Sequence, residues 1–265
     1  MSADAVLLDV DGHVATITLN RPDNRNSMTG DVLAGFADAV ASVRRSRAVR
    51  AVVITGRGAS FCAGADFRGD RGELESGADG DRLAFERTLG IYAPFLSVLD
   101  IEVPVVGALN GHAIGGGLGL ALVCDVRVAN AGAKYGANFV RLGIHSGMAI
   151  SYLLPRIVGV PAAVDLLFSG RLVSGEEAVQ VGLAHCAAEP DRVLPEAQRR
   201  AAEIARGAPL ALRLMKRSLY RGLGWDPRGA AEFEAWAQSA TFSTRDAQEG
   251  IHALLEKREP DFNGR

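Results

Sequence analysis

Three consecutive glycines, Gly115 to Gly117, are the residues whose type and spacing point most directly to chemistry. They follow an apolar run, Val103 to Leu109, and precede another, Leu118 to Val123, so a turn between two buried elements is predicted. Glycine has no Cβ, and its backbone can approach another group closely. If residues 118–124 form a helix, the glycines lie at its N-terminus, where unpaired N–H groups and a partial positive charge suit an oxyanion or a phosphate. A close helix crossing that needs small residues is the alternative.

The spacing of these glycines does not fit the common nucleotide-binding loops. A dinucleotide fingerprint needs Gly-x-Gly-x-x-Gly and an acidic residue about 20 positions further on. Here the glycines fall at positions 115, 116, 117 and 119, and Asp125 follows too soon. The chain also has no Gly-Lys-Ser/Thr of a P-loop.

A second stretch of small residues, Arg57 to Phe67, follows a strand predicted at 52–56. Open α/β sheets bind ligands at the C-terminal ends of their strands, so this stretch is a candidate binding loop. The polar, glycine-rich segment 68–82 comes next. We expect it to be a mobile loop beside the site, with a plain surface insertion as the alternative.

Composition limits the class of protein. The chain has 265 residues, 48% hydrophobic and 23% charged, which indicates one large globular domain or a domain with an appendage. The net charge of −2 argues against a nucleic-acid partner. The first residues lack a basic region and a long apolar core, and no apolar run reaches membrane-spanning length, so we expect a cytoplasmic protein without a membrane partner. Cys62, Cys124 and Cys186 lack metal-ligand spacing, which predicts reduced thiols and no metal site.

Strands and helices are predicted to alternate up to residue 188, and helices alone follow. The signals include a hairpin turn at Asp11-Gly12, a Thr29 helix cap and a capping box at Ser174. Strands are expected at 5–10, 14–19, 52–56, 103–109, 125–129 and 185–188, and helices at 29–45, 83–99, 118–124, 148–157, 161–168, 174–181, 195–206, 208–222, 228–240 and 244–257. This order predicts an α/β core with a helical appendage.

Several motifs in this order resemble the enoyl-CoA hydratase/isomerase, or crotonase, family. They are Arg21-Pro-Asp-Asn-Arg-Asn-Ser-Met, Phe61-Cys-Ala-Gly-Ala-Asp-Phe, Asn110-Gly-His-Ala-Ile-Gly-Gly-Gly-Leu-Gly-Leu, Leu153-Leu-Pro-Arg-Ile-Val-Gly, Pro209-Leu-Ala-Leu-Arg-Leu-Met-Lys and Glu249-Gly-Ile to Phe262. The resemblance covers nearly the whole chain. It implies a right-handed ββα spiral over 1–194 with the acyl-CoA site, and a C-terminal helical region, 195–265, that builds a homotrimer or homohexamer.

The same resemblance implies an oxyanion hole for an acyl-CoA thioester. Its two donors would be the N–H groups of Ala65 and Gly116, aimed at an oxygen that gains charge during reaction. Coenzyme A is then part of the substrate, and no further cofactor is implied. Arg25 is a candidate for the CoA phosphates, with a surface salt bridge as the alternative. The full set implied for CoA or acyl contacts is Arg25, Ala63, Ala65, Asp66, Phe67, Arg68, Gly116, Phe139, Lys257 and Phe262, of which the last two resemble positions that close over the nucleotide, sometimes of a neighbouring subunit.

The chain departs from the family pattern at the two glutamates that hold water and move its proton in hydratases. Aligned on the motifs, they fall on Gly119 and Phe139, and neither side chain can carry a proton. General acid–base groups each contribute about 10²–10⁴ in rate. We therefore expect ordinary hydration through that pair to be absent, and an isomerase that keeps only the second glutamate is disfavoured for the same reason.

His145 is the candidate replacement, because an unperturbed histidine titrates near pH 6.5 and can donate or accept a proton. A loop histidine bonded to backbone is the alternative. Ser146 is expected to cap a helix from about 148, with a nucleophile as the alternative. His112 is expected to be a buried, satisfied histidine, with a position facing the thioester as the alternative, and Asp66 to bond its own loop rather than act as an acid. The acids Asp70, Glu73, Glu75 and Glu86 are unranked, and Phe85, Leu89, Phe139 and Met148 are expected to set the acyl pocket.

Three functions stay open from the sequence. The first is an enzyme of the hydratase/isomerase type. The second is decarboxylation or thioester hydrolysis helped by His145. The third is a non-catalytic acyl-CoA binding protein that keeps the cradle.

Overall fold

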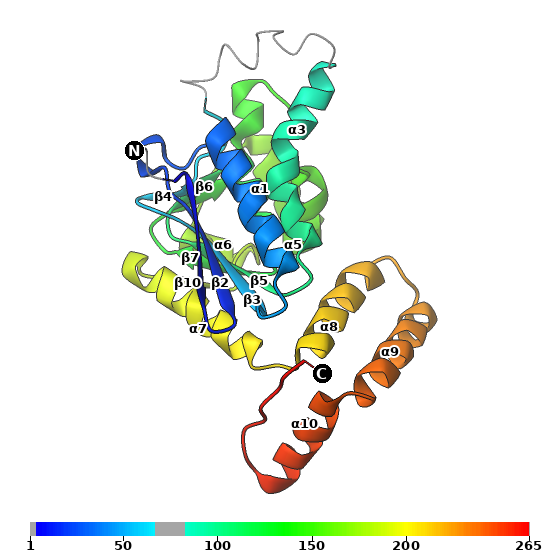
Figure 1. Cartoon of the computed structure of the whole chain (residues 1–265). Coiled ribbons are helices and arrows are strands. Elements are labelled where there is room, and N and C mark those ends of the chain that lie inside the picture. Colours follow the sequence, from blue (N-terminus) through cyan, green and yellow to red (C-terminus); the bar gives the residue numbers. More distant parts are fainter. Residues whose placement is uncertain (1–3, 67–82, 265) are drawn as a thin grey trace.

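A six-stranded sheet forms the centre of the computed structural model, which describes residues 4–66 and 83–264 (Figure 1). The strand order is β1-β2-β3-β5-β7-β10, and all neighbours pair in parallel except the β1–β2 hairpin around Gly12. The strands are β1 (Val6–Asp11), β2 (Val14–Leu19), β3 (Ala51–Gly56), β5 (Val105–Leu109), β7 (Val126–Asn130) and β10 (Cys186–Ala188). Both β3 and β5 are buried along their whole length, which explains their continuous apolar sequence.

A second sheet of very short strands stands beside the first. Its order is β4-β6-β8-β9, and its strands are β4 (Ser60–Cys62), β6 (His112–Ile114), β8 (Lys134–Gly136) and β9 (Val173–Ser174). Each turn of the chain adds one strand to each sheet, as in β3–β4, β5–β6 and β7–β8. This repetition is the expected crotonase-type ββα spiral.

Helices cover both faces of the main sheet. On one face the larger core cluster includes Val32, Phe36 and Val40 of α1 (Gly30–Arg45), and Phe95 of α3 (Ala84–Leu96). On the other face α7 (Val193–Ala205) packs Val193, Ala197, Ala201 and Ala205 against β3, β5 and β7. The remaining elements of the core are α4 (Gly116–Leu122), α5 (Ile150–Ser169), α6 (Gly175–Gln180) and the short 3₁₀ turns at 22–24, 97–100, 138–142 and 190–192.

The helix α5 is long enough and apolar enough, by length and composition alone, to cross a membrane, which the sequence analysis did not expect. Such a helix is weak evidence for a span, because core helices pass the same test. Gly159 has φ 77° and breaks the helix between Pro155 and Pro161. Leu154, Ala163 and Leu166 pack into the larger core cluster, which makes α5 one wall of the folded core.

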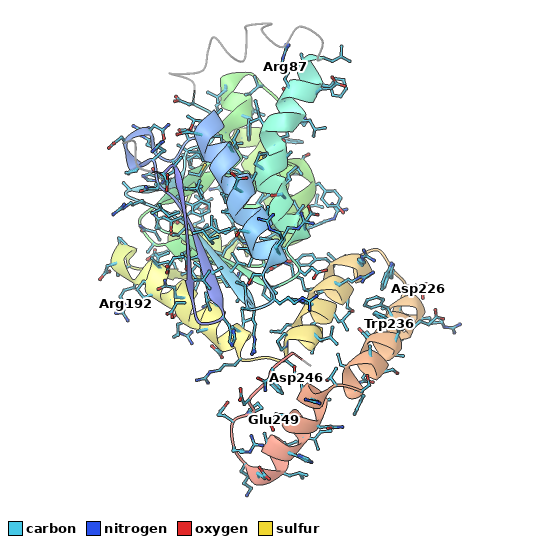
Figure 2. All side chains as sticks on the ribbon, viewed as in Figure 1. Arg87, Arg192, Asp226, Trp236, Asp246 and Glu249 are labelled. Atoms are coloured by element: carbon cyan, nitrogen blue, oxygen red, sulfur yellow. The ribbon has the colours of Figure 1, made fainter. Side chains whose placement is uncertain are left out.

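Three C-terminal helices extend from the core (Figure 1). They are α8 (Pro209–Gly222), α9 (Pro227–Phe242) and α10 (Arg245–Glu256). The chain after α10 folds back onto it, because Asp246 accepts the N–H groups of Asn263 and Gly264, and Glu249 accepts the N–H group of Asp261 (Figure 2). The boundary expected at 194/195 stays a prediction, and α7 beyond it lies on the sheet, so α8 is the first helix that stands apart.

Two local expectations were wrong. The stretches at 60–62 and 112–114 are strands of the second sheet rather than loop or turn, and 173–174, directly before α6, is a further strand that was not expected. Ser146 does not cap a helix: α5 begins at Ile150, and its N-cap is Ala149, with φ 54°.

Candidate functional site

The two candidate donors follow neighbouring parallel strands of the second sheet. Cys62 of β4 pairs with Ala113 of β6, so the residues after both strands emerge at the same edge. A Cβ built on Gly64 would lie 2.8 Å from the carbonyl oxygen of Ile114 and 3.0 Å from the nitrogen of Gly116. The loop carrying Ala65 therefore touches the backbone at the start of α4.

At this contact the N–H groups of Ala65 and Gly116 donate no hydrogen bond to any residue that the structure describes. Two nearby amides are occupied: the Ala63 N–H, two residues before Ala65, donates to the Arg25 carbonyl at 3.1 Å, and the Gly115 N–H, directly before Gly116, donates to the Gly136 carbonyl at 2.9 Å. Ala65 is exposed, whereas Gly116 is buried. Two neighbouring unpaired N–H groups can together donate hydrogen bonds to one oxygen that carries negative charge.

Small residues are required here by contact. A Cβ on Gly117 would lie 1.9 Å from the carbonyl oxygen of Cys62. On Gly116 it would lie 2.4 Å from the sulfur of Met28. The triple glycine is therefore a place of close packing, with β4 rather than a helix as the partner, and this packing sets the position of the Gly116 amide.

A fully buried asparagine, which the sequence analysis missed, fixes the loop before α1 against the Ala65 loop. Asn26 has φ 55°, and its side-chain amide donates to the carbonyls of Ser60 at 2.8 Å and Arg57 at 3.0 Å. The Met28 N–H then donates to the Gly64 carbonyl at 2.8 Å. The only signal in the sequence was the resemblance motif that starts at Arg21.

The two positions that the resemblance assigns to glutamates have apolar surroundings. A Cβ on Gly119 would lie 2.4 Å from the Cβ of Met148, which is buried. The ring of Phe139 is half-buried, and its tip comes within 3.6 Å of a Cβ built on Gly115. Of the other expected pocket residues, Phe85 and Leu89 lie on α3 and are exposed.

Of the two histidines considered, His145 agrees with one of its expected alternatives, and His112 differs from expectation. The His145 ring is exposed, and its Nδ1 donates to the carbonyl oxygen of Ser146 at 2.7 Å, so it is a loop histidine bonded to backbone. This tautomer leaves Nε2 as an acceptor. His112 is exposed rather than buried, and its Nδ1 accepts the Lys134 N–H at 3.0 Å.

The described acidic residues near this edge, Glu86 and Asp66, interact with other residues of the protein. Glu86 accepts the N–H group of Leu83 at 3.0 Å and so caps the start of α3. Asp66 is half-buried and interacts with other residues. Asp70, Glu73 and Glu75 lie outside the described residues.

The residues implied for CoA contacts fall into two groups. Arg25 and Ala63 lie on loops joined by the Ala63–Arg25 hydrogen bond, and the Arg25 side chain is exposed and makes no ion pair with a described residue. Phe67 and Arg68 lie outside the described residues. Phe262 lies elsewhere: its carbonyl accepts from Arg50 at 2.6 Å, just before β3 begins, and Lys257 ends α10. One chain therefore does not bring Lys257 and Phe262 to Ala65.

Burial leaves the thiol at this edge neutral. The pKa of Cys62 is raised to about 12, because desolvation disfavours the thiolate. Desolvation also raises the pKa of Tyr92, whose hydroxyl lies against Gly147. Both groups stay protonated near neutral pH, so Cys62 is not a nucleophile.

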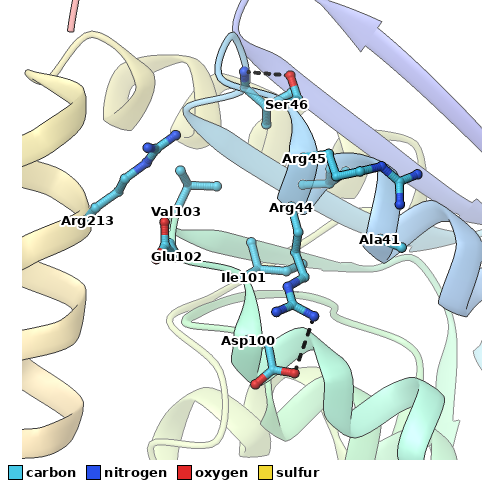
Figure 3. Close-up of a pocket in the computed structure, with 11 residues that line it drawn as sticks. Ala41, Arg44, Arg45, Ser46, Asp100, Ile101, Glu102, Val103 and Arg213 are labelled. Atoms are coloured by element: carbon cyan, nitrogen blue, oxygen red, sulfur yellow. Dashed lines mark hydrogen bonds and ion pairs between the residues drawn. The ribbon is translucent and has the colours of Figure 1, made fainter. Parts of the chain in front are cut away.

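A pocket of about 390 Å³ lies elsewhere, between the C-terminal end of α1, the segment before β5 and α8 (Figure 3). It mixes Arg44, Arg45 and Arg213 with Asp100 and Glu102, and Arg44 pairs with Asp100 at 3.7 Å. Val49 and Val103, which line it, precede β3 and β5. The pocket is thus at the opposite end of the sheet from Ala65 and Gly116.

The fold and the comparisons with known proteins indicate the same class of protein. The structure has a crotonase fold, since it matches a crystal structure of enoyl-CoA hydratase from Bacillus anthracis with a TM-score of 0.92 and 30% identity, over 98% of this chain and 100% of that one. The family model for enoyl-CoA hydratase/isomerase matches residues 9–265. The chain belongs to the enoyl-CoA hydratase/isomerase family.

Two curated relatives cover nearly the full length. The crotonyl-CoA hydratase of Syntrophomonas wolfei is 35% identical over 99% of this chain and 99% of its own. The short-chain-enoyl-CoA hydratase of Clostridium acetobutylicum is 34% identical over 97% of each chain.

Proposed function

We propose that this protein binds the CoA thioester of an acyl group and polarises its carbonyl between the N–H groups of Ala65 and Gly116. The observation that carries this proposal is the contact of two neighbouring loops, each ending in an amide without a partner among the described residues. The relatives are named as hydratases of crotonyl-CoA and short-chain enoyl-CoA, which share the thioester. The exposed guanidinium of Arg25, one hydrogen bond from Ala63, is the proposed contact for the CoA phosphates.

The reaction proposed is one that stabilises an enolate-like oxygen without the usual carboxylate pair. Gly119 offers no side chain, and Phe139 offers only a ring. Efficient addition of water through two carboxylates is therefore not the proposed chemistry, and each missing group accounts for about 10²–10⁴ in rate.

Decarboxylation or hydrolysis of the thioester with His145 as the proton carrier is the second candidate. Its support is the exposed ring whose Nδ1 is held by the Ser146 carbonyl, which leaves Nε2 free to accept a proton. A non-catalytic acyl-CoA binding protein is the third, because the amide pair alone can hold a thioester.

The experiment compares the purified protein with Gly116→Pro and Gly116→Ala. Proline removes the N–H and is accepted at the first position of a helix, whereas alanine keeps the N–H and adds a Cβ at the same place. Acyl-CoA binding is measured by calorimetry, and turnover by crotonyl-CoA absorbance, CO₂ release from malonyl-CoA and thiol release from acetyl-CoA. We expect any turnover to fall about 10²–10³-fold more in Gly116→Pro than in Gly116→Ala.

The outcomes separate the candidates. Rapid crotonyl-CoA hydration would contradict the proposed loss of carboxylate chemistry. Thiol or CO₂ release that is lost in His145→Ala supports the second candidate, and tight binding without turnover supports the third. No binding of any acyl-CoA, or equal behaviour of the two Gly116 variants, contradicts the amide pair itself.

A further inference from the structure

Two consecutive residues before α5 have a backbone conformation that glycine normally adopts. Met148 has φ 57° and Ala149 has φ 54°. Non-glycine residues at positive φ are uncommon, and the conformation is strained unless the surrounding structure holds it. Such residues concentrate at functional sites, so the contacts of Met148 bear on the candidate site.

The Met148 side chain is buried against Gly119 of α4. A Cβ built on Gly119 would lie 2.4 Å from the Met148 Cβ, 3.1 Å from its Cγ and 3.4 Å from its carbonyl oxygen. The nearest atom is a Cβ, which is fixed to the backbone, so a change of rotamer at Met148 would not relieve the contact. Any side chain at position 119 thus requires a backbone shift at 148.

The loop around Met148 is confined on its other side as well. A Cβ on the preceding residue, Gly147, would lie 2.3 Å from the hydroxyl of Tyr92 on α3. The Gly147 carbonyl also accepts the N–H of Ile150 at 3.1 Å. The segment from Gly147 to Met148 therefore lies between Tyr92 of α3 and Gly119 of α4.

Gly119 lies close to the proposed oxyanion site along α4. Its N–H donates to the Gly115 carbonyl at 3.2 Å, so it is one helical turn beyond the Gly116 amide. Met148, which packs on Gly119, therefore lies about one helical turn along α4 from the Gly116 amide.

We propose that Met148 is a specificity-determining residue of the acyl-CoA site. Its side chain occupies the space that a side chain at position 119 would fill, and it forms the wall next to Gly116. This inference rests on the proposed function for its ligand, but its steric part stands on the contacts alone. It predicts that positions 119 and 148 exclude each other: a side chain at 119 needs glycine at 148, and alanine at 148 is not enough because it keeps the Cβ.

A double-mutant cycle of unfolding equilibria tests the steric part. Gly119→Ala is made in the wild type, in Met148→Ala and in Met148→Gly. We expect Gly119→Ala to raise the unfolding constant at least about tenfold in the first two backgrounds and less than about threefold in the third, since directly contacting residues couple. Equal effects in the Met148→Ala and Met148→Gly backgrounds would overturn the exclusion.

Ligand selectivity tests the functional part without relying on the glycine variant. Calorimetry gives the ratio of the dissociation constants of butyryl-CoA and octanoyl-CoA for wild type, for Met148→Ala and for Leu166→Ala, a control buried in the same core cluster on α5. We expect Met148→Ala to shift the ratio at least about threefold toward the longer chain, by the loss of buried methylene and sulfur volume, and Leu166→Ala to leave it unchanged. An unchanged ratio in Met148→Ala would overturn the role of Met148, whereas no acyl-CoA binding by the wild type would overturn the proposed function and with it this role.

Discussion

A Cβ on Gly117 would lie 1.9 Å from a backbone oxygen of β4, and one on Gly119 would lie 2.4 Å from the Met148 Cβ. At the scale of single residues these absent side chains shape the candidate site. The sequence could predict that the backbone at Gly115 to Gly117 comes close to another element, because residues without a Cβ allow such an approach. It could not predict that Met148 fills the space next to Gly119, or that Asn26 holds two loops together, since partners across the chain depend on the register of short strands.

One histidine away from the site is expected to make stability depend on pH. His185 accepts the backbone N–H of Arg127 at 3.1 Å, and burial, followed by the charges of Arg127 and Arg200, lowers its pKa below the ordinary value. Between the lowered pKa of the folded state and the ordinary pKa of the unfolded state, the unfolded chain therefore binds more protons than the folded one. The stabilisation is fully present above about pH 6.5 and is lost as pH falls through the lowered pKa.

Chemical denaturation between pH 7.5 and 5 checks this expectation. The wild type should lose more stability on acidification than His185→Asn, and His252→Asn, an exposed histidine change on α10, should follow the wild type. Parallel curves for wild type and His185→Asn would refute the role of His185.

At the scale of elements, the strongly periodic segments were predictable. The helices expected at 29–45, 195–206 and 208–222 are α1, α7 and α8 within two residues, and Ser174 caps α6 by accepting the Glu177 N–H at 3.2 Å, as its capping box predicted. The second sheet was not predictable, because strands of two or three residues are too short to show a period. Yet the pairing of β4 with β6 is what brings Ala65 and Gly116 together.

The attachment of α8 to the core depends on a mostly buried ion pair. Lys216 of α8 pairs with Asp125 at 2.8 Å and donates to the Val103 carbonyl at 3.0 Å. The two side chains are 12% and 15% exposed. Lys216→Met leaves the mostly buried Asp125 carboxylate without its cation, although the Val105 N–H still donates to it at 2.6 Å, and this should cost about 3 kcal/mol of unfolding free energy.

Urea denaturation measures this cost, with Lys134→Met, a change at an exposed residue of β8, as the control. Adding Asp125→Asn to Lys216→Met should recover part of the loss, because the unpaired charge is removed. A loss in Lys216→Met as small as in the control would mean that the pair does not hold α8 to the core.

At the scale of the whole molecule, α9 and α10 stand apart from the core beyond α8, and all three helices carry exposed apolar side chains (Figures 1 and 2). These include Trp236 and Phe242 on α9 and Leu254 and Leu255 on α10. Exposed apolar patches of this kind mark contact surfaces. We propose that these helices build the homotrimer or homohexamer implied by the resemblance, which would also allow Lys257 and Phe262 to reach the site of a neighbouring copy.

Sedimentation equilibrium tests the assembly. We expect a mass three or six times that of the 27.9 kDa chain, and a smaller species for Trp236→Glu combined with Leu254→Glu. Arg228→Glu, an exposed change at the start of α9, is the control for added charge. A monomeric wild type at micromolar concentration would contradict the proposal.

We propose that the N–H groups of Ala65 and Gly116 converge on one thioester oxygen. Infrared difference spectroscopy of an acyl-CoA with a ¹³C-labelled thioester carbonyl reports on that oxygen directly. Two hydrogen bonds in a water-poor site should shift the carbonyl stretch to lower wavenumber than in water, in the wild type and in Gly116→Ala, and the shift should shrink in Gly116→Pro. A bound carbonyl that absorbs as in water, or an unchanged shift in Gly116→Pro, would contradict the claim.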